Sequence, residues 1–145
     1  TTTLTACMTT TGLAAGTWYF EYHVVWQSAT TTVGSNFSVN STATVTRVRS
    51  NRHYNSTTTG TASGIADDVA ATLTGQLVGH MTSRTDNGSL GPNTGVATIN
   101  VDLYDVIRGL LVTSTTGDLV LKHASETATS TQVMADTLLF LRKIN

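Results

Sequence analysis

Charged side chains are scarce in this chain, and their scarcity excludes several classes of protein. Asp, Glu, Lys and Arg make up 12% of the 145 residues, about half of the usual share. Eight basic and nine acidic residues give a net charge of −1, so the composition has no electrostatic footprint for nucleic acid or an anionic membrane. We therefore expect neither as a partner.

Cysteine and long apolar runs are also scarce. The single cysteine, Cys7, cannot form a disulfide within the chain, and a cysteine-based metal site would need other chains. Runs such as Leu138 to Leu141 are far too short to cross a bilayer, and the N-terminus has no basic segment followed by a hydrophobic one. The sequence therefore predicts neither a transmembrane segment nor a signal peptide.

Hydroxyl side chains take the place of charges, with 31 threonines and 12 serines. Threonine is β-branched and suits the pleated surface of a strand, so the composition favours β structure over helix. The length fits a single domain.

Alternating side chains predict the strands. The strongest pattern runs from Thr17 to Gln27, where five large apolar residues at period two indicate a long half-buried strand. These residues, expected to pack in the core, are Trp18, Phe20, Tyr22, Val24 and Trp26. Further strands are predicted at Thr30–Asn40, Ser41–Asn51, Gln76–Arg84, Val106–Ser114, Asp118–His123 and Thr137–Ile144.

The segments between these strands carry turn and loop signals. Thr115-Thr116-Gly117 has the length and glycine placement of a tight hairpin that would join its two flanking strands. Asn51–Gly64 is small and polar and predicts a surface loop, Ile65–Leu73 fits a short helix or a strand, and Asp86–Asn93 is rich in turn formers.

Seven to nine short strands with turns between them predict an all-β fold, a single-domain jelly roll, β-sandwich or barrel. We expect residues 1–15 to form an N-terminal arm or first strand and residues 16–145 to form the jelly-roll domain.

An aromatic strand and four further motifs support a family resemblance. Gly16–Tyr22 resembles the G-x-aromatic-x-F-x-aromatic strand of C1q and tumour-necrosis-factor-like jelly rolls, with Trp18 where that motif usually has Tyr. The chain from about Gly16 onward resembles a family of phage virion proteins. The motifs that carry this second likeness are Leu77–His80, Leu90–Gly95, Arg108–Thr127 with its Gly-Asp-Leu and Ser-Glu-Thr, and the final Lys143-Ile144. The resemblance implies a compact jelly roll that assembles as a trimer on a virus particle.

Two sets of residues are predicted to contact other chains. The trimer seam is predicted at Tyr19, Val25, Leu139 and Leu141, and contact with the capsid or another acidic partner at Arg47, Arg49 and Arg52. For the basic cluster, a solvated edge strand protected by charge is the favoured alternative. Tyr19, Tyr54 and Tyr104 are expected to be free for surface contacts.

Catalytic and metal-binding motifs are not evident. His23, His53, His80 and His123 lack ligand spacing on one element, although a trimer would bring three copies of one histidine together at its axis. Glu21 and Glu126 form no paired-carboxylate motif, and Ser63 is one place off a nucleophile elbow. We expect no catalytic residue, no metal and no cofactor.

These observations predict a non-enzymatic virion protein on the outer surface of a phage particle. It would be a decoration or cement protein that binds the major capsid protein as a homotrimer and stabilises the shell. The alternative is a fibre-tip or receptor-binding domain that recognises a host glycan through loops such as Asn51–Gly64 and Asp86–Gly95.

Overall fold

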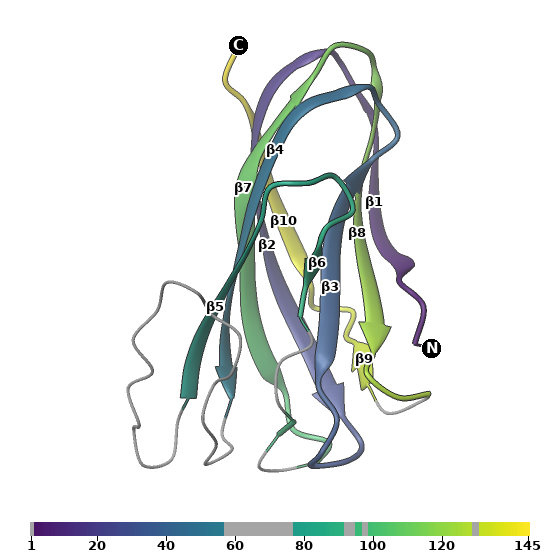
Figure 1. Cartoon of the computed structure of the whole chain (residues 1–145), viewed down its shortest axis with the longest axis vertical. Helices are drawn as coiled ribbons and strands as arrows, with labels where there is room; N and C mark the ends of the chain where they lie inside the picture. Colours follow the sequence, from purple (N-terminus) through teal and green to yellow (C-terminus); the bar gives the residue numbers. More distant parts are fainter. Residues whose placement is uncertain (1, 57–76, 92–94, 97–98, 129–130) are drawn as a thin grey trace.

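The computed structural model describes residues 2–56, 77–91, 95–96, 99–128 and 131–145 (Figure 1). These residues form strands and connecting turns and contain no helix. The strands are β1 (Thr5–Leu13), β2 (Gly16–Ser28), β3 (Ser35–Ser41), β4 (Val45–Ser56), β5 (Leu77–Ser83), β6 (Ser89–Leu90), β7 (Leu103–Thr113), β8 (Gly117–Ser125), β9 (Thr131–Val133) and β10 (Leu138–Lys143). The predicted all-β class is confirmed. The segment Ile65–Leu73 lies outside the described residues.

The strands form two antiparallel sheets that pack face to face as a β-sandwich (Figure 1). In the small sheet the order is β1-β8-β3-β6. In the large sheet it is β10-β2-β7-β4-β5, and β9 also pairs with β2. Residues 1–15 were expected to be an arm or a first strand, and β1 makes most of them an edge strand of the small sheet.

The core lies between the sheets, and the period-two pattern of β2 places it there. Phe20, Tyr22, Val24 and Trp26 are fully buried, while Trp18 at the strand's end is partly buried against the same cluster. Burying one such side chain contributes about 1.5–3 kcal/mol. Both tryptophans therefore pack as predicted, and the core fixes which face of β2 points outward.

Gly109 allows close packing in the middle of the large sheet. It lies between Phe20 of β2 and Ser50 of β4. A Cβ atom added there would lie 1.9 Å from the carbonyl oxygen of Arg49 and 2.8 Å from the ring of Phe20. Glycine is therefore needed here chiefly because the backbone of β4 lies so close, and also because of the Phe20 ring.

The predicted hairpin at Thr115-Thr116-Gly117 is wrong, because β7 and β8 belong to different sheets. The connection runs from the large sheet to the small sheet. Thr44, the residue before β4, holds it by two hydrogen bonds: Ser114 N donates to Thr44 O at 3.0 Å, and Thr44 N donates to Thr115 Oγ1 at 2.8 Å. Gly117 packs directly against Ala43. A short glycine-containing turn suits a sheet crossing as well as a hairpin.

The predicted loop Asn51–Gly64 changes at β4. The strand continues to Ser56, so the first part of that loop is extended, and the remainder lies outside the described residues. β5 pairs with β4 only from Ser50 to Ser56, whereas Arg47 and Arg49 pair with β7 alone among the described strands. These two arginines therefore lie along an open edge of the sheet, as the charged-edge alternative predicts.

Candidate interaction surface

The outward face of the large sheet is the candidate site, because it carries most of the exposed large hydrophobic side chains. Among the described residues, these side chains are Ile99, Val101, Tyr104, Leu110, Leu138, Phe140 and Ile144. All of them lie on β7 or β10 or directly beside those strands. The outward positions of the small sheet carry polar residues instead, such as Asn36 and Asn40 on β3 and Lys122 on β8.

Exposed and partly exposed rings and aliphatic side chains gather across β7, β2 and β10, and we call them the aromatic patch: His23, Val25, Tyr104, Leu138 and Phe140. The register places Leu138 opposite His23 and Val25 opposite Tyr104. His23 packs edge-on against Phe140 with ring centroids 5.2 Å apart, and its centroid lies 5.6 Å from that of Tyr104. Phe140 and Leu138 are each 58% exposed.

A chain of hydrogen bonds runs through the polar atoms of this face. Tyr19 donates its hydroxyl to Glu21 Oε2 at 2.5 Å, and His23 Nε2 lies 2.7 Å from Glu21 Oε1. His23 Nδ1 contacts the Tyr104 hydroxyl. The bonds from Tyr19 and His23 lower the pKa of Glu21, and the bond to Glu21 raises the pKa of Tyr19. The network holds the four side chains in fixed orientations.

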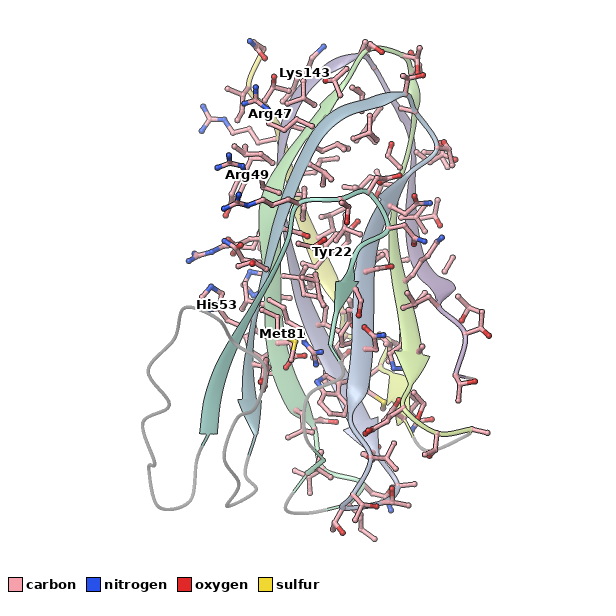
Figure 2. All side chains as sticks on the ribbon, viewed as in Figure 1. Tyr22, Arg47, Arg49, His53, Met81 and Lys143 are labelled. Atoms are coloured by element: carbon pink, nitrogen blue, oxygen red, sulfur yellow. The ribbon has the colours of Figure 1, made fainter. Side chains whose placement is uncertain are left out.

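Four arginines surround Leu110 at the other end of the same face, and we call them the arginine patch: Arg47, Arg49, Arg108 and Arg142. All four are exposed. Arg49 lies opposite Leu110, which lies opposite Tyr19, which lies opposite Arg142, so one row crosses four strands. Figure 2 shows Arg47 and Arg49 projecting away from the sandwich, as their alternate positions predict.

A shallow pocket adjoins the arginine patch where β2 and β10 meet. It has a volume of about 370 Å³ and is lined by Tyr19, Arg142 and Ile144. One wall is therefore cationic and another apolar.

Arg52, predicted as a partner contact, is fully buried, and that prediction is wrong. Its Nε donates to Asp105 Oδ2 at 2.8 Å and its Nη2 lies 2.5 Å from the same oxygen. Nη1 donates to the carbonyls of Ser35 and Leu90, at 2.7 and 2.8 Å, so the side chain ties the large sheet to the small sheet. Burial raises the pKa of Asp105, and the charge of Arg52 opposes that rise.

The parity of the strand explains this error. Arg47 and Arg49 occupy odd positions of β4, whereas Arg52 shares the even positions of the buried Val48 and Tyr54. Tyr54 is accordingly buried rather than free for surface contacts, while Tyr104 is exposed and Tyr19 partly exposed. The alternation of inward and outward positions along β4 predicts the burial of both Arg52 and Tyr54 from the sequence.

The predicted seam residues divide between the two faces of the large sheet. Tyr19 and Val25 lie on the outward face, partly exposed. Leu139 and Leu141 pair with Tyr22 and Phe20 and pack against the core. The exposed apolar residues of β10 are Leu138 and Phe140, which were not among the predicted seam residues. Leu139 and Leu141 therefore cannot share one flat contact with Tyr19 and Val25.

Three of the four histidines lie in the large sheet, and His123 lies in the small sheet. His53 and His80 occupy opposite positions in the β4–β5 register, and His23 lies on the outward face of β2. His123 is buried against the ring of Phe37, and burial followed by the charge of Arg52 lowers the pKa of His123 to about 4. Sequence spacing could not reveal these pairings, because they depend on strand register.

Acidic residues singled out earlier have local roles where they are described. Glu126 Oε2 accepts from Gly34 N at 3.0 Å, and Asp86 Oδ1 accepts from Ser41 N at 2.9 Å. Ser63 lies outside the described residues. In the described part of the chain, no group of three or more His, Cys, Asp or Glu side chains is placed to hold a metal ion. Likewise, none of the described residues forms a helix able to span a membrane.

No protein-family model matches this chain, and neither does any curated protein or solved structure. The likeness to phage virion proteins therefore remains a prediction that rests on its four sequence motifs.

Proposed function

We propose that this protein is a non-enzymatic structural component of a phage virion. It acts as a decoration or cement protein that forms homotrimers, binds the major capsid protein on the outer surface of the particle and stabilises the shell. The motif resemblance supports the virion assignment. The exposed face of the large sheet supports the role of an assembly module.

The strand order supports a jelly roll as the fold of this module. Successive strands alternate between the sheets from β1 to β4 and again from β5 to β9: β1, β3, β6 and β8 belong to the small sheet, and β2, β4, β5, β7, β9 and β10 to the large sheet. Such wrapping of the chain around two sheets is typical of jelly rolls. The pair β4 and β5 extends the large sheet beyond β7.

The aromatic patch is the observation that carries the proposal. Exposed apolar side chains that touch one another on a flat sheet face mark a protein interface, because their contact with water is unfavourable. Glu21 holds His23 by a hydrogen bond, and His23 in turn contacts the Tyr104 hydroxyl, so these side chains lose less conformational entropy on association. A symmetric trimer would use the patch three times.

Native mass spectrometry at micromolar concentration tests self-association. We expect the unaltered chain to be a trimer and Phe140→Ser with Leu138→Ser to be monomeric. Ile99→Ser is the matched control, since Ile99 is also exposed but lies in the connection before β7. A monomeric unaltered chain, or a trimer that survives the double substitution, would refute the seam at this patch.

Binding to phage heads that lack this protein tests the decoration role. We expect the trimer to bind these heads in sedimentation and to raise the temperature at which they release DNA. Glycan-array binding without binding to heads would instead favour the fibre-tip function.

A further inference from the structure

Three of the four arginines in the arginine patch carry charges that the described part of the chain does not neutralise, whereas the fourth, Arg108, interacts with Tyr19 and Glu21. The ion pairs in the described residues join Arg52 to Asp105 and His23 to Glu21. Within that part of the chain, no carboxylate lies within ion-pair distance of Arg47, Arg49 or Arg142. Glu21, the carboxylate on this face, already accepts from Tyr19 and lies 2.7 Å from His23. Unpaired guanidinium groups are therefore concentrated at one end of the sheet.

The spacing of these groups matches an extended polypeptide. Alternate residues of a strand lie about 7 Å apart on one face, which is the separation of the Arg47 and Arg49 backbone positions along β4. Across the sheet, three strand spacings of about 4.8 Å separate β4 from β10, so Arg49 and Arg142 lie about 14 Å apart. That span corresponds to four residues of an extended chain.

Apolar groups lie between the arginines. Leu110 is 38% exposed in the row that joins Arg49 to Arg142, and Ile144 is 56% exposed beside the pocket. A ligand that fits this surface presents carboxylates and apolar side chains together. Carboxylates suit the planar arginine fork, which binds them through two parallel hydrogen bonds.

We propose that the arginine patch binds an extended acidic segment of a protein partner, in which carboxylates alternate with apolar residues. One apolar side chain of the segment enters the pocket of Tyr19, Arg142 and Ile144. The assignment of that partner as the shell protein rests on the proposed function, whereas the acidic chemistry rests on the arginines. The exposed leucine and isoleucine, and a net charge of −1 for the whole chain, favour a polypeptide over nucleic acid.

Fluorescence anisotropy with a labelled glutamate–tyrosine copolymer tests this proposal on the full chain. We expect binding that weakens as salt rises, and at least about tenfold weaker binding by Arg47→Glu with Arg49→Glu. Arg84→Glu is the matched control, because Arg84 is also exposed but lies in the turn after β5. Circular dichroism verifies that each variant is folded.

Three results would overturn the proposal: no binding of the copolymer, equal binding by the double variant, or stronger binding of a DNA oligonucleotide of the same charge. Native mass spectrometry on the same samples tests trimer formation separately from copolymer binding. A monomer whose copolymer binding depends on Arg47 and Arg49 supports the patch and refutes the trimer, and a trimer without such binding does the reverse.

Discussion

The two faces of the large sheet carry the same residue types, but these side chains are buried on the inward face and exposed on the outward face. On the inward face, Arg52 is buried in an ion pair that links the two sheets, whereas Arg49, three residues earlier, projects into solvent. Leu139 packs against the core while its neighbour Leu138 is exposed. The comparison teaches that position along the strand, and not residue type, separates side chains that hold the fold from side chains that are available to partners.

Removal of Arg52 should have the largest effect on stability. Arg52→Ala leaves the Asp105 carboxylate buried without its cation and frees the carbonyls of Ser35 and Leu90. We expect the free energy of unfolding to fall by about 3–5 kcal/mol, measured by urea denaturation. A loss below about 1 kcal/mol would show that the ion pair does not hold the sheets together.

Acid should destabilise the fold through His123, which is buried on β8 of the small sheet. Its pKa is about 4 when folded and 6.5 when unfolded, so between these values the unfolded chain binds a proton that the folded chain does not. Stability is therefore complete above about pH 6.5 and falls as the pH drops towards 4, by about 3 kcal/mol at most.

His123→Gln is the control for this pH dependence, because an amide keeps a polar group near Thr131 and does not titrate. Urea denaturation at several pH values should give a shallower decline for the variant between pH 6.5 and 4. Identical declines for the two proteins would assign the acid sensitivity to other groups.

An added methyl group at Gly109 tests how closely β2, β7 and β4 pack around this position in the large sheet. Gly109→Ala places a Cβ atom against the Phe20 ring and the Arg49 carbonyl oxygen. We expect a loss of about 1–3 kcal/mol, visible as a lower midpoint in thermal unfolding. The double variant with Phe20→Leu should recover part of the loss only if the ring is the main obstacle.

The outward face should give the smallest effect. Arg49→Ala removes an exposed side chain without a carboxylate partner among the described residues, so the free energy of unfolding should change by less than about 0.5 kcal/mol. The contrast with Arg52→Ala, measured in the same urea series, is the direct test of the two-face comparison. A large loss of unfolding free energy in Arg49→Ala would contradict the comparison of the two faces.

The sequence predicted those features that depend on local alternation. The predicted strand from Thr17 to Gln27 agrees with β2 to within one residue at each end. The charge of Arg52 predicts exposure, whereas its even position in β4, shared with the buried Val48 and Tyr54, places it in the core. The crossing at Thr115–Gly117 was read as a hairpin because both connections use the same turn residues.

The interaction surface itself was beyond local reasoning. The aromatic patch joins residues of β2, β7 and β10, which meet only through strand register. Leu138 and Leu139 are adjacent apolar residues at the start of a short strand, so their sequence alone does not decide which one faces inward. That choice follows from pairing with β2.

The pairing of β1 with β8 has a consequence for synthesis of the protein. Thr5 and His123 are partners although 118 residues separate them, so β1 leaves the ribosome well before its partner strand exists. At about 5–20 residues per second, it waits roughly 6–24 s. Contacts of such long range also predict slow folding.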